Sequence, residues 1–451
     1  MKKYQKISNL FEEDKGLSGK DSSRRTLNNV VINIIFQGFT FVLGLGSNLI
    51  LARLLTPEDF GLVASVVLLT TFLGIINSGG LAQATIRESS INHQKISALV
   101  WVNVCIGLIL AVISLIAAPF IAGFFGDARI TQIIYLFSLS ILATSVSIQY
   151  RALLLRNFLY LKLNTIDLLC LGTGISTSVL LAMNGFGYWS IVIGTTTTAV
   201  LKPIGYVAMT RWLPSLALKK AGIRSMLKFG ADVIGFQFIN YFTRNLDNIL
   251  IGRVLGVAAL GQYSFAYRLA VAPIAQICGP INNALLPALS RLKDEPEAYQ
   301  EIYSRYTRLL AIFLVLPIAS AGFFGQSLLI YLAGPEWSLA GETLEWLALA
   351  CCMQPLANLT GIVFLTTGRT RPQLYWALFI APFVWATFYF TVDYGVIALS
   401  KGYLIVNLVF TPICLIWAFY GTKLSLRKYM KVYMPVYLAV LILACSRFLI
   451  L

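Results

Sequence analysis

Two stretches of the chain, SNLILARLLTPEDFG at residues 47–61 and DNILIGRVLGVAALG at residues 247–261, match each other along their length. The matched positions are Asn48 and Asn248, Arg53 and Arg253, Leu55 and Leu255, Gly61 and Gly261, and Phe36-Gln37 and Phe236-Gln237. Leucine, isoleucine and valine match by chance between any two apolar segments, whereas amide and arginine matches seldom do. The pattern therefore predicts an internal repeat, with each copy ending one apolar segment and turning into the next.

The composition around these stretches excludes a soluble protein. Of the 451 residues, 58% are hydrophobic and only 12% are charged, and the mean hydropathy is +0.77. A soluble domain has roughly 45–50% apolar and about 25% charged residues. We therefore set aside a disordered chain, a secreted disulfide scaffold and an ordinary cytosolic enzyme, and expect most of the surface to face lipid.

Thirteen segments are long and apolar enough to be membrane-spanning helices, since a helix needs about 20 apolar residues to cross about 30 Å of hydrocarbon. They are residues 29–52, 60–82, 97–122, 131–150, 163–184, 187–210, 229–252, 261–285, 308–332, 343–366, 373–391, 394–420 and 432–450. Alternating ten-residue segments typical of a transmembrane barrel are absent. The sequence thus predicts an all-α polytopic membrane protein, whose first span is an uncleaved signal-anchor.

The net charge of +16 divides along this topology. Most of the 35 lysines and arginines fall in the N-terminal tail and in every second loop, while the intervening loops carry Asp127, Glu336 and Asp393. By the positive-inside rule the tail and the basic loops are cytoplasmic. The excess that would suggest a nucleic-acid partner in a soluble protein is here predicted to orient the bundle.

The repeat and the spans together predict five parts of the chain. They are a cytoplasmic tail at 1–27, an N-terminal six-helix lobe at 28–210, a basic cytoplasmic linker at 211–228, a C-terminal six-helix lobe at 229–420, and a basic loop with an additional helix at 421–451. The linker, RWLPSLALKKAGIRSMLK, mixes cations with apolar residues, which favours the anionic inner leaflet over nucleic acid as its partner. Two lobes facing a central cavity are the arrangement that alternating access needs.

A small group of cations lies outside the basic loops, and charges within a span normally face a cavity or a partner. We predict that Arg53, Arg244, Arg253, Arg268 and Lys401 line a water-filled vestibule that receives an anionic head group such as pyrophosphate. For Arg244 the alternative is an ion pair with Asp247 one helical turn away. Asp247 and Asp232 are the candidates for ion coupling, the alternative being that each pairs with a neighbour.

Nothing in the sequence predicts a catalytic centre, a metal site or a cofactor. The single histidine, His93, excludes a serine–histidine–aspartate arrangement of the usual kind, and the seven cysteines lie in apolar runs and are expected to be reduced core residues. Walker A, kinase, G-x-S-x-G and H-E-x-x-H patterns are absent. The sequence therefore predicts a secondary transporter without an ATPase, rather than an enzyme.

Several motifs resemble a known family. They are LARLLTPEDFGLVA at 51–64, QYRALLLR at 149–156, DNILIGRVLGVAALGQYSFAYRLAVAP at 247–273, LLPALSRLKDEPE at 285–297, GPEW at 334–337 and GRTRP at 368–372. In this order they resemble the polysaccharide transporter family of the multidrug/oligosaccharidyl-lipid/polysaccharide (MOP) superfamily, especially its Wzx-type lipopolysaccharide, colanic-acid and teichuronic-acid exporters. The resemblance covers essentially the whole chain.

The resemblance implies a MATE-like MOP fold, two six-helix bundles around a cationic lumen. It also implies an inner-membrane flippase that moves undecaprenyl-pyrophosphate-linked oligosaccharide, such as an O-antigen or exopolysaccharide unit, to the periplasmic leaflet. Partners would be that lipid, the phospholipid bilayer and polysaccharide polymerase or export machinery. Family members usually have fourteen spans; only thirteen precede Leu451, so we expect the last helix to be absent and the C-terminus to lie outside.

Three alternative functions remain at this point. A lipid II-type flippase would differ only in the sugar of the cargo. A drug or ion antiporter of the same superfamily carries cationic cargo and needs acids in its lumen, whereas the predicted lumen is cationic. A polysaccharide polymerase or ligase needs a large periplasmic loop to hold its reaction, and every predicted outer connection is short.

Overall fold

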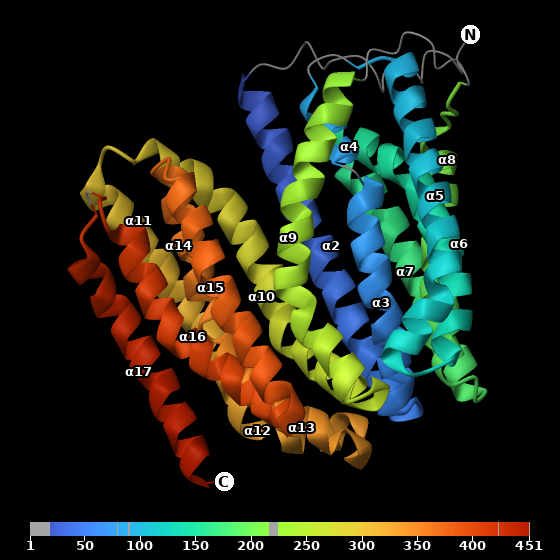
Figure 1. Ribbon diagram of the computed structural model, residues 1–451. Helices are drawn as coiled ribbons and strands as arrows, with labels where there is room; N and C mark the ends of the chain where they lie inside the picture. The colour runs from blue at the N-terminus through green and yellow to red at the C-terminus, as the bar shows by residue number, and fades with distance from the viewer. Residues whose placement is uncertain (1–18, 79, 89–90, 216–223, 423, 451) are drawn as a thin grey trace. The chain divides into compact units, whose positions relative to one another are not determined.

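The computed structural model describes residues 19–78, 80–88, 91–215, 224–422 and 424–450 of the chain, and all regular structure in them is helical (Figure 1). The α-helices are α2 Gly19–Leu54, α3 Pro57–Ser78, α4 Leu81–Arg87, α5 His93–Phe125, α6 Arg129–Arg156, α7 Tyr160–Met183, α8 Tyr188–Thr210, α9 Arg224–Val254, α10 Val257–Arg291, α11 Pro296–Leu310, α12 Leu316–Ala333, α13 Ser338–Cys351, α14 Gln354–Thr366, α15 Thr370–Thr391, α16 Val396–Phe419 and α17 Leu426–Ile450. Short η segments complete the set: Ala311–Val315, Pro335–Trp337 and Val392–Tyr394.

Eleven helical segments among the described residues are long and apolar enough to cross a membrane. Each of the thirteen predicted spans coincides with a helix or a pair of consecutive helices; α9 and α10 occupy the seventh and eighth and are not among the eleven. In the ninth span, the π-helical Ala311–Val315 connects α11 to α12 without a break. The prediction of an all-α, multi-pass membrane protein is confirmed.

The chain divides into two units, Met1–Asn245 and Leu246–Leu451. The division falls within α9, downstream of the predicted linker at 211–228. Residues 1–18 of the predicted tail and residues 216–223 of the predicted linker lie outside the described residues. The five predicted parts of the chain and the role of the linker at the lipid surface therefore stay predictions.

The repeated stretches adopt the same local structure. In the first copy α2 ends at Leu54 and α3 begins at Pro57, and in the second α9 ends at Val254 and α10 begins at Val257. The connections are two residues long in both, and each closes with the same backbone hydrogen bonds, from the residue after the first helix to the carbonyl four positions earlier. The predicted repeat is thus present at the turn that its sequence specifies.

The two copies start their second helix by different means. In the first copy Thr56 and Asp59 form a reciprocal cap, in which the Thr56 N–H donates to Asp59 Oδ2 at 3.0 Å and the Asp59 N–H donates to Thr56 Oγ1 at 3.3 Å. The other oxygen of Asp59 accepts the Tyr188 N–H at 2.9 Å, which ties the start of α8 to the start of α3. In the second copy the cap position is Gly256, whose φ of +86° suits glycine.

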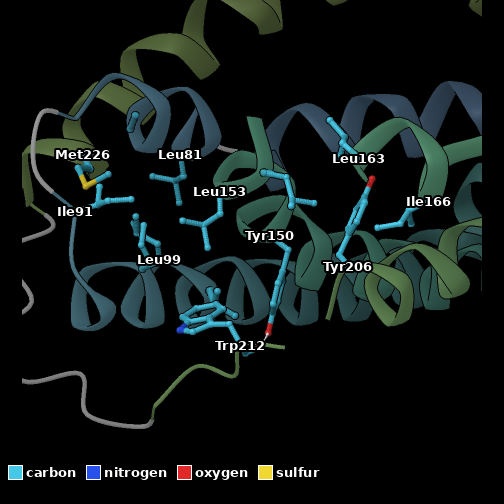
Figure 2. Packing of buried hydrophobic residues seen from close by; sticks show 14 of the residues in the cluster. Leu81, Ile91, Leu99, Tyr150, Leu153, Leu163, Ile166, Tyr206, Trp212 and Met226 are labelled. Carbon is cyan, nitrogen blue, oxygen red and sulfur yellow. Dashed lines mark hydrogen bonds between the residues drawn. The ribbon is translucent and has the colours of Figure 1, made fainter. Parts of the chain in front are cut away.

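The first unit has a core that includes Trp212, two residues after the end of α8 (Figure 2). Trp212 is 1% exposed and packs against Tyr150, whose hydroxyl donates to the Trp212 carbonyl at 3.3 Å. The Trp212 indole N–H donates to Nδ1 of His93 at 2.8 Å, at the start of α5. The beginning of the predicted linker is therefore an integral part of this unit.

The second unit is built around α13, in which every residue from Thr343 to Cys351 is buried. This helix contacts α10, α12, α16 and α17, and in Figure 1 α17 lies along the outside of α16. Five of the seven cysteines are buried as predicted. Cys105 and Cys445 are exposed instead, because they lie on outward faces of α5 and α17, where an apolar thiol suits a lipid-facing surface.

Candidate functional site

Arg268 lies well inside α10, a helix of the second unit. It lies about 16 Å from the start of α10 at about 1.5 Å per residue, which is close to the middle of about 30 Å of hydrocarbon. Its side chain is exposed on the unit. A guanidinium within the hydrocarbon is stable only toward a polar cavity or a polar partner.

Arg244 has a comparable position on α9. It is exposed and lies about 15 Å from the end of that helix. Arg53 and Arg253 occupy equivalent positions in the last turns of α2 and α9, and both are exposed. The repeat therefore places one arginine at the same helix end in each unit, close to the level where head groups lie.

Asp247, near the end of α9, is 4% exposed and has its hydrogen bonds within the second unit. Its Oδ2 accepts the Tyr263 hydroxyl at 2.7 Å, and its Oδ1 accepts the backbone N–H and the side-chain amide of Asn248 at 2.8 and 3.0 Å. The Tyr263 ring stacks on Tyr267, immediately before Arg268. These contacts fix the carboxylate without requiring the ion pair with Arg244.

Lys401, on α16, lies in an aromatic surrounding. Its ammonium is 4.7 Å from the centroid of the Trp346 ring and 5.7 Å from that of Phe448. The Arg447 guanidinium lies 5.5 Å from the same Trp346 ring. Two cations from α16 and α17 thus share one indole of α13, an arrangement that cation–π attraction stabilises.

Beside this indole is a buried carboxylate that the sequence analysis did not select. Glu345 is 3% exposed; its Oε1 accepts the Gln326 N–H at 2.9 Å and its Oε2 pairs with Arg447. The signal was present in the sequence as an acid inside the tenth apolar segment, and Arg447 was one of the cations left outside the basic loops. Their pairing was not readable, because it depends on which faces of α13 and α17 meet.

The first unit contains a cleft of about 320 Å³ between α6 and α8. Its polar lining consists of Thr144, Ser147, Thr195, Thr198, Tyr206, Arg151 and Lys202. Most of these hydroxyls donate to carbonyls of their own helices, so their oxygens remain as acceptors. Lys202 pairs with Asp167 at 3.6 Å and Tyr206 donates to Asp167 at 2.6 Å. The cleft combines hydroxyl acceptors with cationic donors, which suits sugar and phosphate groups.

The predicted residues divide between the units. Arg53 and Arg244 belong to the first; Arg253, Arg268, Lys401 and Asp247 belong to the second. Asp232 lies on α9, with its side chain outside the described residues. Among the described residues no group of three His, Cys, Asp or Glu could hold a metal ion. That these cations line one vestibule stays a prediction.

The fold is similar to that of solved transporters of the MOP superfamily. The solved structure of the lipid II flippase MurJ in its inward closed conformation aligns with a TM-score of 0.68, covering 93% of this chain and 97% of that one at 13% identity. At this identity the likeness concerns the fold. The MATE-like MOP fold implied by the sequence motifs is confirmed.

A comparison with protein families identifies the family of this chain. The chain belongs to the family described as polysaccharide biosynthesis protein, which matches residues 50–340. It is 24% identical to the succinoglycan biosynthesis transport protein ExoT of Rhizobium meliloti, over 79% of this chain and 72% of that protein. It is 22% identical to the lipopolysaccharide biosynthesis protein WzxC of Escherichia coli, over 90% of this chain and 83% of that protein.

Proposed function

We propose that this protein is a flippase that moves undecaprenyl-pyrophosphate-linked oligosaccharides from the cytoplasmic to the periplasmic leaflet of the inner membrane. The observation that carries the proposal is the family match over residues 50–340, with a polysaccharide transport protein among the relatives. The absence of ATPase and covalent-catalysis motifs from the sequence supports a secondary transporter, working by alternating access, over an enzyme. The basic tail and loops support a cytoplasmic N-terminus.

The pyrophosphate of the cargo would meet the mid-membrane arginines. Arg244 and Arg268 are exposed at depths where lipid contact is unfavourable, and the planar guanidinium suits phosphate oxygens. Arg53 and Arg253 would attract the same group nearer the surface, and Lys401 would add to the positive potential of the lumen. A polysaccharide polymerase on the periplasmic side would take up the translocated unit.

Transport is tested in a strain that lacks its own oligosaccharide flippase and accumulates lipid-linked repeat units. Expression of this protein should clear the accumulated lipid, whereas clearance of lipid II instead would assign it to the alternative cargo. If no flippase-deficient strain is relieved by the correctly inserted protein, the proposed function is wrong.

The role of Arg268 is tested by Arg268→Ala, with Arg291→Ala as the matched control on the same helix. Arg291 is exposed in the last turn of α10 and was attributed to topology. Loss of one charge-assisted hydrogen bond of about 1.5–3 kcal/mol should reduce translocation of pyrophosphate-linked lipid in proteoliposomes about 10- to 100-fold. Equal activities of the two variants at equal incorporation would remove Arg268 from the site.

Ion coupling is assigned to the carboxylates of α9, Asp247 and Asp232. A buried carboxylate held by hydrogen bonds, as Asp247 is, can exchange a cation or proton when its partners move. Asp247→Asn should abolish the acceleration of transport by an imposed ion gradient, and the exposed Asp393→Asn should not. Gradient-driven transport that survives Asp247→Asn would place the coupling elsewhere.

A further inference from the structure

The second unit has an open cleft of about 870 Å³ between α11 and α17. Six charged side chains line it, namely Glu297, Glu301, Arg305 and Arg308 from α11 and Lys428 and Lys431 from α17. Four cations against two carboxylates give the cleft a net charge of about +2 near neutral pH. The sequence analysis attributed these four cations to membrane topology alone.

The faces of α11 explain how the charges come to line one cleft. Tyr299, Gln300, Tyr303, Thr307 and Leu310 form its buried face. Arg305 and Arg308, one helical turn apart, lie on the other face, as Lys428 and Lys431 do on α17. Two pairs of cations, one from each helix, therefore line the same cleft.

The two walls are fixed to one another by contacts behind the cleft. The Ser425 N–H donates to Gln300 Oε1 at 3.1 Å and Gln300 Nε2 donates back to the Ser425 carbonyl, so the start of α17 is bound to α11. The Tyr303 and Tyr429 rings lie 5.0 Å apart, and Tyr429 stacks on Phe419 at 5.1 Å. The helix faces that carry the four cations are therefore held together before any ligand arrives, which reduces the ordering cost of binding.

The ion pairs of the described residues lie away from the cleft. The ion pairs found among the described residues engage Lys95, Arg129, Lys202 and Arg447. None of these pairs, in the part of the chain that the structure describes, includes a cation of the cleft. The cleft therefore keeps more positive than negative charge.

The cleft lies where membrane head groups are expected. Its charged residues come before or at the start of two predicted spans, 308–332 for those of α11 and 432–450 for those of α17. Val432 and Pro435 continue the lining along α17 with apolar surface. A ligand with an anionic head and an apolar chain matches this lining. The head would meet the cations, and the chain would follow the apolar surface along α17.

We propose that this cleft binds the phosphate-bearing head group of a membrane lipid. Arg305 and Arg308 donate to phosphate oxygens from one wall, and Lys428 and Lys431 complete the charge from the other. The shared chemistry is a phosphate or diphosphate ester attached to an apolar chain, from either a glycerophospholipid or a polyprenyl diphosphate. With a glycerophospholipid as source, the assignment goes beyond the proposed function; with a polyprenyl diphosphate, it rests on that function. In neither case does it depend on the direction of transport.

The test measures binding of soluble short-chain lipids to the purified full-length protein in neutral detergent, by calorimetry. The probes are dihexanoyl phosphatidylglycerol, farnesyl diphosphate and inorganic pyrophosphate, with dihexanoyl phosphatidylcholine as the zwitterionic control. The variant R308Q/K431Q removes one cation from each wall. Its matched control, R291Q/R427Q, removes two exposed cations outside the cleft and leaves the same net charge.

We expect R308Q/K431Q to weaken binding of an anionic lipid probe at least about tenfold, because that is the effect of losing one charge-assisted hydrogen bond. The control R291Q/R427Q should change the affinity less than about twofold. Glu301→Gln, at an exposed position in the cleft, should tighten binding because it removes a repelling charge. Preference for phosphatidylglycerol identifies a phospholipid source, and preference for farnesyl diphosphate identifies a polyprenyl source.

Three results would overturn the assignment. Equal weakening of lipid binding by both double variants would mean that the probe is attracted by the general surface charge and not by the cleft. Binding of inorganic pyrophosphate without either anionic lipid would exclude a lipid ligand. Failure of Glu301→Gln to tighten binding would exclude the cleft even if R308Q/K431Q folds poorly. Because the readout is binding rather than transport, these failures are distinct from a failure of the flippase assay.

Discussion

The buried pair of Glu345 and Arg447 should make the last helix an integral part of the second unit. Glu345 is 3% exposed and the Arg447 side chain 15% exposed. Removing one partner of a buried ion pair leaves the other charge uncompensated, at a cost of about 3–5 kcal/mol. We expect Glu345→Gln to destabilise the protein more than Arg447→Gln does. Glu345→Gln leaves two cations, Arg447 and Lys401, over the Trp346 ring without the carboxylate.

At about 2 °C per kcal/mol for a chain of this size, Glu345→Gln should lower the melting temperature by about 6–10 °C. Heating the detergent-solubilised protein and measuring the monodisperse fraction gives this value. The exposed acid in Glu336→Gln serves as control and should change the midpoint little.

A double-mutant cycle isolates the pair itself. The double variant E345Q/R447Q should be less destabilised than the sum of the single variants, because it leaves no unpaired member of the pair. Additive effects, or an unchanged midpoint for Glu345→Gln, would refute the reasoning that this pair attaches α17 to α13.

Two further predictions concern the loops of the first unit. Asp59→Ala removes both the cap of α3 and the acceptor for the Tyr188 N–H. It should therefore destabilise the protein by about 2–4 kcal/mol, measured by thermal unfolding, and Asp59→Asn should have an intermediate effect. A smaller effect of Asp59→Ala than of Asp393→Asn would contradict this prediction. The hydrogen bond from Arg129 lowers the pKa of Asp127, so its stabilisation is present above the unfolded-state pKa and is lost as pH falls through the lower native value. Since Arg129 is 44% exposed, Asp127→Asn should lower stability by only about 0.5 kcal/mol at pH 7, and the difference from the unsubstituted protein should shrink when unfolding is repeated at low pH; a difference that grows there would reverse the assignment.

The candidate site could be predicted only in part. The depth of Arg244 and Arg268 follows from counting residues along apolar segments, because each residue of a helix advances by about 1.5 Å. The surroundings of Asp247 and Lys401 did not follow, because Tyr263, Trp346 and Phe448 approach them from other helices. Sequence spacing indicates which residues share a helix face but not which helix that face meets.

The sequence by itself determined the class of fold. Within lipid every backbone N–H and C=O must be paired inside its own segment, so an apolar stretch of sufficient length becomes a helix whatever lies beside it. The repeat could be read from residues 47–61 and 247–261 because a cap and a helix end are local features of the sequence. The predicted topology rests on an equally local signal, the distribution of cations among the loops.

The tertiary structure alone decided which charges are paired and which are available. Glu345 and Arg447 lie 102 residues apart in the chain and meet only because α13 packs against α17. Arg308 and Lys431 lie still further apart, and both line the cleft between α11 and α17. Side-chain charge is a property of the sequence, but the partner of a charge depends on which helix faces pack together.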